Sequence, residues 1–477
     1  MYLLHRADRT SFKEIGATFA IKDNIVTSDL PTSCASNILR GYAAPENASV
    51  VKFLKQAGLT MLGKTNMDEF GMGSHSRNSA FGPVERQVND MVLSVGGSSG
   101  GSALLVASGF AHFGIGTDTG GSVRLPAAYL NIIGFKPSYG RISRYGVVPY
   151  ANSLDTVGLF ATSCESIQHL FRILDRHDAK DPTSMTSASR DLMGQKKGLA
   201  QKRPATARGW KSTPTTSEQM RKKRIGVPIE YNVAEMQNGV RDAWLRSLNM
   251  LVARGHEIVP VSLPSTRLAL SAYYVLAPAE ASSNLAKYDG VRYGAQRSSA
   301  AGEDVLYSKH RGEQFGEEVK RRILLGTYSL SAGAMDNYFI QAQKVRRLVQ
   351  HDFDRVLSLP NLLREELTPT KDGVDFIVCP TAPTFPPRVS SLARASPVET
   401  YTNDVLTVPA SLAGLPAVSI PAPPSAETLT TGADRAVGIQ VIGQYWTDDE
   451  VLRFAEMNFE GTQDWSQNHQ ATRKTTM

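Results

Sequence analysis

The sequence contains few cysteines, and none of them stands close to another. Cys34, Cys164 and Cys379 form no C-x-x-C pair, whereas disulfide frameworks and thiolate zinc sites require clustered cysteines. The nine histidines are scattered without the spacing of metal ligands. We therefore exclude a disulfide-rich secreted domain, and we expect a reducing compartment and no bound metal in this chain.

Long apolar runs are also missing. No segment approaches the roughly 20 apolar residues that a helix needs to cross a bilayer, so we expect no membrane insertion. The first 13 residues contain Arg6, Arg9 and Lys13, but Asp8 interrupts the acid-poor pattern of a transit peptide. The start of the chain alone is therefore a weak targeting signal.

An excess of one charge is confined to a single segment. The formal net charge of +7 would by itself suggest a nucleic-acid partner. Between residues 190 and 224, however, 11 Lys and Arg accompany two acidic residues, which leaves the rest of the chain at −2. Because this segment also lacks apolar periodicity, we expect residues 185–222 to form a disordered, solvated insertion rather than an RNA-binding arm.

The rest of the sequence alternates between strand-like and helix-like patterns. With 41% hydrophobic and 20% charged residues, the chain can form one large globular domain over residues 1–477. Short apolar runs predict strands and amphipathic stretches predict helices, so we expect an α/β fold with a sheet between layers of helices. The predicted strands are 17–21, 60–62, 91–95, 112–116, 258–261, 376–379 and 438–442, with another from residue 223, and the predicted helices are 48–57, 102–110, 239–253 and 449–459.

The segment Gly-Gly-Ser-Ser-Gly-Gly-Ser at residues 96–102 is the first candidate functional site. A flexible linker disagrees with the apolar residues on both sides, and a phosphate loop would end in Gly-Lys-Ser/Thr, whereas Gly101 precedes Ser-Ala. A nucleophile elbow of an α/β-hydrolase fits, because residues 96–100 satisfy G-x-S-x-G between a predicted strand and a predicted helix. The motif alone leaves open that Ser98 is such a nucleophile.

A second glycine-flanked serine, Ser122, follows in the segment Gly-Thr-Asp-Thr-Gly-Gly-Ser-Val-Arg-Leu-Pro at residues 116–126. Ser98 and Ser122 are 24 residues apart, and Lys22 lies in the sequence Ile-Lys-Asp-Asn-Ile. In this order and spacing the three segments resemble the amidase signature family. The resemblance implies an amidase-signature fold with a large mixed β-sheet, and a triad in which Lys22 is the base, Ser98 relays the proton and Ser122 is the nucleophile.

These residue types suit amide hydrolysis. An amide carbonyl is a weak electrophile, so it needs an activated nucleophile and hydrogen-bond donors for the oxyanion. Glycines allow the backbone to turn its N–H groups toward one point, and a lysine serves as base only if burial lowers its pKa toward neutrality. The expected oxyanion hole consists of the amides of Thr119, Gly120, Gly121 and Ser122.

The resemblance extends over nearly the whole chain outside the basic segment. It is strongest to the A subunits of glutamyl-tRNA(Gln) amidotransferases in their fungal mitochondrial form, which also have a short start before the lysine. It implies that Arg322 holds the α-carboxylate of glutamine and Asp404 its α-amino group, with Tyr273 lining the pocket, and such pairings suit a guanidinium and a carboxylate. The matching segments are 65–73, 134–141, 153–158, 280–285, 320–328, 380–383 and 412–416.

The function implied by the resemblance is glutamine hydrolysis through a glutamyl ester on Ser122. The released ammonia would convert Glu-tRNA(Gln) to Gln-tRNA(Gln) on a B-type partner subunit, with a small accessory subunit in the same complex. The resemblance assigns ATP and Mg²⁺ to the partner and no cofactor to this chain, and it implies a mitochondrial matrix location. The chain departs from the pattern at Arg77, where many relatives have an acidic residue.

Several alternatives remain open at this point. The chain could be a stand-alone amidase acting on another small amide, an esterase of the α/β-hydrolase type with Ser98 as nucleophile and a later histidine as base, or a scaffold subunit without catalysis. We expect Asp118 and Arg124 to hold the second loop as an ion pair or cap rather than to act as acid and base.

Overall fold

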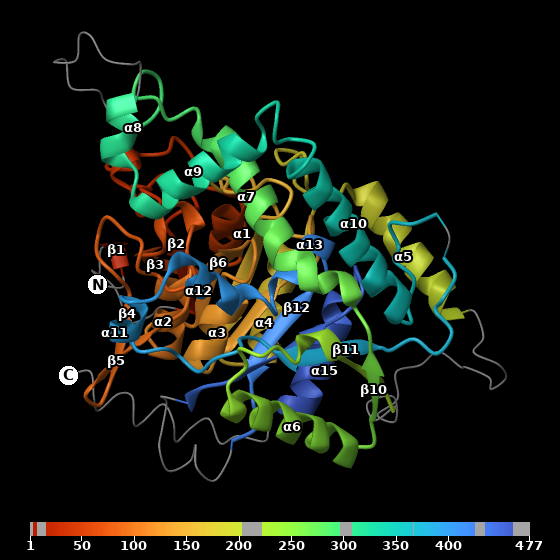
Figure 1. The fold of residues 1–477 in the computed structure, drawn as a ribbon. Coiled ribbons are helices and arrows are strands. Elements are labelled where there is room, and N and C mark those ends of the chain that lie inside the picture. The colour runs from red at the N-terminus through yellow and green to blue at the C-terminus, as the bar shows by residue number, and fades with distance from the viewer. Residues whose placement is uncertain are drawn as a thin grey trace.

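The computed structural model describes residues 3–6, 16–202, 222–295, 308–365, 367–424 and 435–460. Its centre is a mixed sheet of 11 strands in the order β1-β3-β2-β6-β8-β7-β12-β13-β11-β9-β10, with helices around it (Figure 1). Strand β2 is parallel to both β3 and β6, and β6 is antiparallel to β8. This architecture confirms the expected α/β fold with a large mixed sheet between helices.

The strands of this sheet come from all parts of the chain, so that segments far apart in the sequence lie side by side. Most are five or six residues long, and nearly all residues of the central strands are buried, as is typical of strands covered on both faces. The strands are β1 (Leu3–Arg6), β2 (Thr18–Lys22), β3 (Thr60–Thr65), β6 (Phe113–Asp118), β7 (Ile133–Lys136), β8 (Thr156–Ala161), β9 (Arg224–Pro228), β10 (Glu257–Val261), β11 (Phe376–Pro380), β12 (Ala417–Pro421) and β13 (Gly438–Ile442).

The helices cover both faces of the sheet. Helices α2 and α3 pack on one face, α1, α4 and α15 pack on the other, and α7 packs against α9 and α10 (Figure 1). No helix in the described part of the chain is long and apolar enough to cross a membrane. The helices are α1 (Ser49–Gln56), α2 (Gly100–Ala107), α3 (Arg124–Leu130), α4 (Cys164–Leu174), α5 (Ser187–Lys202), α6 (Asn238–Ala253), α7 (Ala269–Leu285), α8 (Ser308–Gln314), α9 (Glu317–Ser329), α10 (Phe339–Val356), α11 (Val389–Leu392), α12 (Pro397–Tyr401), α13 (Val408–Ala413) and α15 (Asp448–Phe459).

Strand β2 alternates between the two faces. Phe19 and Ile21 belong to the apolar cluster that includes helix α1, whereas Ala20 belongs to the cluster formed by α2. Since successive side chains of a strand point to opposite faces, Lys22 follows Ala20 toward α2. Glycine in β6 lets α2 come close, because a Cβ at Gly114 would lie 2.9 Å from the Ser102 carbonyl oxygen. Strand β2 thus places Lys22 near the start of α2.

The strand before the Gly/Ser-rich segment is present but does not join the central sheet. Strand β5 (Met91–Ser94) pairs antiparallel with β4 (Glu85–Val88) in a separate two-stranded sheet. A nucleophile elbow requires the preceding strand to belong to the central α/β sheet. The G-x-S-x-G match is therefore not an elbow, and this finding counts against Ser98 as a nucleophile of the α/β-hydrolase type.

The basic segment differs from the expectation over part of its length. Disorder was expected over residues 185–222, but Ser187–Lys202 form helix α5, and residues 203–221 lie outside the described residues. Lys196 Nζ donates to the carbonyl oxygens of Leu362 and Arg364 at 3.0 and 3.1 Å, and Lys197 pairs with Glu450 at 2.5 Å. The expectation was wrong here because lysine side chains, rather than an apolar stripe, attach the helix.

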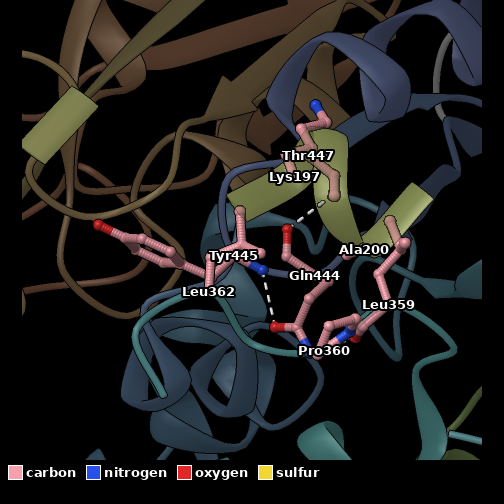
Figure 2. A pocket seen from close by; sticks show the side chains of 8 residues that line it. All are labelled: Lys197, Ala200, Leu359, Pro360, Leu362, Gln444, Tyr445 and Thr447. Carbon is pink, nitrogen blue, oxygen red and sulfur yellow. Dashed lines mark hydrogen bonds between the residues drawn. The ribbon is translucent and has the colours of Figure 1, made fainter. Parts of the chain in front are cut away.

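Two buried side chains complete the contact between α5 and the rest of the molecule. Met193 and Ala200 are both shielded from solvent, and Ala200 and Lys197 border a narrow cavity of about 10 Å³ together with residues of the segments 359–362 and 444–447 (Figure 2). Helix α5 therefore packs on the C-terminal part of the chain, beside helix α10 (Figure 1).

Candidate active site

The lysine of the first motif lies at the end of β2, fully buried, and touches the first serine cluster. Lys22 Nζ is 2.6 Å from Ser98 Oγ and 3.0 Å from Thr117 Oγ1. Burial lowers the pKa of Lys22 to about 7, although the buried carboxylates of Asp68, Asp118 and Asp155 act in the opposite direction. Because an ammonium without water is costly, the neutral amine that can accept a proton is accessible near neutral pH.

The loop that carries Ser98 is held by tight backbone packing. The Gly97–Ser98 peptide bond is cis, and Gly96 has a φ of +76°. A Cβ at Gly97 would lie 2.3 Å from Asp68 Oδ2, so only glycine fits against this carboxylate. Asp68 in turn accepts hydrogen bonds from the backbone of residues 76, 77 and 78. The position of Ser98 is therefore fixed by neighbours from the 68–78 segment.

Ser122 follows β6 and lies beside the first cluster. The backbone N–H of Ser99 donates to the Ser122 carbonyl oxygen at 3.2 Å, and the Ser99 hydroxyl donates to the Thr117 carbonyl oxygen at 3.2 Å. Ser122 is half-buried. The structure thus brings Lys22 and Ser98 into direct contact and places Ser122 next to them through the backbone, while no hydrogen bond joins the two serine hydroxyls.

The glycines before Ser122 are needed for close approach, not for an unusual φ. A Cβ at Gly120 would lie 2.7 Å from Cζ of Tyr273, and a Cβ at Gly121 would lie 2.3 Å from Thr407 Oγ1 and 3.4 Å from Asp404 Oδ1. Neither glycine has a positive φ. Within the described part of the chain, the backbone N–H groups of residues 119–122 donate to no acceptor, so they are available to an oxyanion.

Asp118 and Arg124 hold this loop in place, as expected. Both side chains are fully buried, and Arg124 Nη2 pairs with Asp118 Oδ1 at 2.8 Å. Asp118 Oδ2 also accepts from the backbone N–H of Val123 at 3.2 Å, and the Arg124 guanidinium donates to the Thr407 carbonyl oxygen and to Gln440. With all these partners satisfied internally, the pair is a structural brace for the loop.

Tyr274 contacts both Arg322 and Asp404. Arg322 is only 2% exposed, and its guanidinium carbon lies 5.2 Å from the centre of the Tyr274 ring. The Tyr274 hydroxyl donates to Asp404 Oδ2 at 3.3 Å, and Ser74 donates to the same oxygen at 2.7 Å. Burial raises the pKa of Asp404 to about 6, against the lowering effects of Ser74 and Arg322.

Arg322 has further partners that its sequence context does not reveal. Its Nε donates to Glu318 Oε1 at 2.8 Å, and its Nη1 donates to the Tyr150 hydroxyl at 2.7 Å. Tyr401 donates to the same Glu318 oxygen at 2.7 Å and stacks on Tyr274 with ring centres 4.1 Å apart. The guanidinium is therefore oriented by one carboxylate and surrounded by tyrosines.

A polar cavity of about 180 Å³ opens beside Arg322. Its walls include helix α9, which carries Arg322, and residues 68–78, which support the serine loop and include Arg77. Among the described residues, no group of three or more His, Cys, Asp or Glu is placed to hold a metal ion. The cavity is lined by Asp68, Gly73, Ser74, His75, Arg77, Asn78, Glu318, Arg321, Arg322, Leu392, Ala395, Pro397, Thr400 and Tyr401.

Sequence reasoning missed several residues of this site. Tyr150 and Tyr274 stand in no recognised motif, and Thr117 stands in the segment 116–126 without having been singled out. Asp68 stands inside the recognised segment 65–73, and its position between glycine-rich loops was a usable signal. The ring of Tyr273 lies against Gly120, and Tyr273 is not among the residues that line the cavity beside Arg322.

Comparisons with known proteins agree with this geometry. The model of the family described as Amidase matches residues 13–452. The A subunit of the mitochondrial glutamyl-tRNA(Gln) amidotransferase of Fusarium vanettenii is 55% identical over 94% of this chain and 87% of its own length, and that of Coccidioides posadasii is 52% identical over 93% and 89%. The crystal structure of the A subunit of the Thermotoga maritima glutamyl-tRNA(Gln) amidotransferase has a TM-score of 0.72 at 33% identity, over 95% of this chain and 85% of that one.

Proposed function

The chain belongs to the amidase family, and we propose that it is the glutamine-hydrolysing component of a mitochondrial glutamyl-tRNA(Gln) amidotransferase. The identity of more than 50% to fungal proteins of that name, over more than nine tenths of this chain, supports the proposal. The observation that carries the activity is the fully buried Lys22, whose Nζ lies 2.6 Å from Ser98 Oγ and whose pKa is about 7.

The first chemical step is acylation of Ser122. Neutral Lys22 accepts the proton of the Ser98 hydroxyl, Ser98 accepts the proton of Ser122, and the Ser122 oxygen attacks the side-chain amide carbon of glutamine. The oxygen of that carbonyl becomes an oxyanion, and the free N–H groups of residues 119–122 are the donors that stabilise it. Their lack of internal acceptors in the described residues supports this role.

The second step releases ammonia and restores the enzyme. The tetrahedral intermediate collapses as its C–N bond breaks, and the protonated Lys22 returns a proton through Ser98 to the departing nitrogen. A glutamyl ester then remains on Ser122. Water attacks this ester, again with Lys22 and Ser98 taking the proton, and glutamate leaves while the Ser122 hydroxyl is regenerated.

Recognition of glutamine uses the second half of the site. Arg322 pairs with the α-carboxylate and Asp404 with the α-ammonium, which matches their opposite charges and their burial. Asp404 lies next to Gly121, as its Oδ1 would be 3.4 Å from a Cβ there. This proximity supports a substrate whose charged end reaches Asp404 while its amide end reaches the loop of residues 119–122.

The partners follow from the same assignment. An amidotransferase of this kind is an enzyme of several subunits, and we propose a B-type subunit that uses ATP, Mg²⁺ and Glu-tRNA(Gln), together with a small accessory subunit. The chain itself then needs no cofactor. Its location is mitochondrial, as in the named relatives, and we place it in the matrix, where the tRNA would be.

A glutaminase assay on the purified complex tests the proposal. We expect ammonia release from L-glutamine that a Ser122→Ala variant abolishes, and formation of Gln-tRNA(Gln) when ATP and Glu-tRNA(Gln) are added. Ammonia release from simple amides but not from glutamine would point to a stand-alone amidase. No release in any case would point to a scaffold without catalysis, and either result would refute the proposal.

A further inference from the structure

Glu69 belongs to the segment that supports the Ser98 loop, and its side chain contacts the start of helix α9, which carries Arg322. Its side chain is buried and accepts two hydrogen bonds from different parts of the chain. Ser36 donates to Oε1 at 2.5 Å, and the backbone N–H of Gly316 donates to Oε2 at 2.8 Å. Gly316 is the N-cap of helix α9, whose sixth residue is Arg322. A carboxylate from a distant segment thus occupies the positive end of the helix that carries Arg322.

The backbone at Gly316 comes close to the carboxylate of Glu69. A Cβ at Gly316 would lie 2.3 Å from Glu69 Oε2, well inside van der Waals contact. The neighbouring aromatic residues reinforce the joint, because Phe70 lies 5.7 Å from Phe315, between ring centres, in an edge-on arrangement. The start of α9 is therefore held against residues 69 and 70 by a hydrogen bond to the Glu69 carboxyl group and by an aromatic contact.

The other half of α9 is fixed in a different way. A Cβ at Gly326 would lie 1.9 Å from the carbonyl oxygen of Pro278 in α7, so the two helices cross at backbone contact. Arg322 lies between Gly316 and Gly326. The crossing with α7 therefore fixes helix α9 after Arg322, and the side chain of Glu69 holds the helix before it.

The segment that holds α9 also holds Ser98. The backbone N–H of Asp68 donates to the Ser98 carbonyl oxygen at 3.2 Å, and a Cβ at Gly71 would lie 3.6 Å from Ser98 Oγ. Glu69 stands between these two residues. We propose that Glu69 is a positioning residue that sets Arg322 relative to the serine loop, so that a substrate bound by Arg322 presents its amide at the correct distance.

This inference rests on the proposed function, because the group that Arg322 binds is the α-carboxylate of glutamine. It predicts that Glu69→Ala and, to a lesser degree, Glu69→Gln weaken glutamine binding without disabling the chemistry. We expect KM for glutamine to rise about three- to tenfold and kcat to stay within about twofold. The effect is modest because Glu69 does not contact the substrate and acts through the position of Arg322. Glu317→Gln is the matched control, because that exposed carboxylate also lies at the start of α9.

Two measurements on the full complex decide the inference. The first is kcat/KM for Glu69→Ala in the wild-type and Arg322→Ala backgrounds. If Glu69 acts through Arg322, its effect disappears once Arg322 is absent, whereas an equal loss in both backgrounds, or a loss in kcat alone, would overturn the proposal. The Glu317→Gln control should leave kcat/KM unchanged, and a loss equal to that of Glu69→Gln would also overturn it.

The second measurement does not depend on activity. Hydrogen exchange of backbone amides in residues 317–322 should accelerate in Glu69→Ala, while exchange in α10 stays as in the wild type. Unchanged exchange in α9 would overturn the inference even if kinetics are altered. A wild-type complex that hydrolyses no glutamine would instead refute the proposed function, and the exchange experiment would still decide whether Glu69 holds the helix.

Discussion

The two halves of the candidate site are built in contrasting ways. The half around Lys22 and Ser98 is made of short side chains and glycines packed at backbone distance, and its charged group is fully buried. The half around Arg322 and Asp404 is made of long side chains from helices and loops, arranged around tyrosine rings and open to a cavity of about 180 Å³. The first half suits proton transfer over short distances, and the second suits recognition of a charged ligand.

The two halves of the site need different properties of their charged groups. A base must lose water so that its pKa approaches neutrality, and burial achieves this for Lys22. A recognition site must keep its charges, and here Glu318 orients the guanidinium of Arg322 while Ser74 and Tyr274 donate to Asp404. If this division holds, substitutions in the first half should lower kcat and those in the second should raise KM.

The largest expected effect is that of Ser122→Ala. Removal of the nucleophile should lower kcat for glutamine on the order of 10⁴-fold or more, measured as ammonia release by the complex. Because Ser122 is half-buried and serine differs from alanine by one hydroxyl, the melting temperature should stay as in the wild type. Activity that survives Ser122→Ala but vanishes in Ser98→Ala would break the assignment of the first half.

A smaller effect is expected from Asp404→Asn. Loss of the negative charge removes a charge-assisted hydrogen bond to the substrate ammonium, for which about 1.5 to 3 kcal/mol is typical. KM for glutamine should therefore rise about 10- to 100-fold, while kcat changes much less. Steady-state kinetics with glutamine measure both values. A fall in kcat with an unchanged KM would show that the two halves do not divide the work as described.

The pH dependence should separate the two halves. The lowered pKa of Lys22, about 7, makes the neutral base the dominant form only above that pH, and Asp404 is ionised above about 6. We expect kcat/KM to fall about tenfold per pH unit below 7, and more steeply below 6. In Asp404→Asn the break near 6 should vanish while the break near 7 remains, and loss of both breaks would contradict the assignment.

The smallest expected effect is that of Tyr273→Phe. The tyrosine ring packs on Gly120, and its hydroxyl interacts with Tyr150, which accepts from Arg322. Phenylalanine keeps the ring, so kcat should stay the same, and KM should rise about two- to threefold through the loosened Tyr150. A large fall in kcat would instead place Tyr273 in the first half of the site.

The signals for the two halves of the site in the sequence differ in kind. Lys22, Ser98 and Ser122 stand in motifs with a fixed order and spacing, because backbone packing at glycines ties sequence closely to geometry. Arg322 and Asp404 are separated by helices and loops and stand in no such motif, so that the resemblance to a family was their only signal, whereas for the triad it added roles to motifs already visible. Tyr274, which links the two side chains, has no local signal because its role arises from tertiary packing.

The secondary structure was predicted only where its sequence pattern is local. Eight short apolar strands and the helices α1, α2, α6 and α15 were predicted within a few residues, since their periodicity is strong, whereas the other described helices were not predicted. Helix α5 was missed, because Lys196 and Lys197 attach it through carbonyl oxygens and a carboxylate rather than through an apolar stripe. Gly120 and Gly121 also make room for Tyr273 and Thr407, which their sequence did not indicate.

The burial of Lys22 has a consequence for chemical selectivity. A lysine whose pKa is lowered toward neutrality is a better target for acylating and aldehyde reagents than an ordinary surface lysine. Lys22 is fully buried, so such electrophiles cannot reach its nitrogen while the protein is folded. The packing that makes this amine reactive toward a proton therefore also protects it from covalent damage.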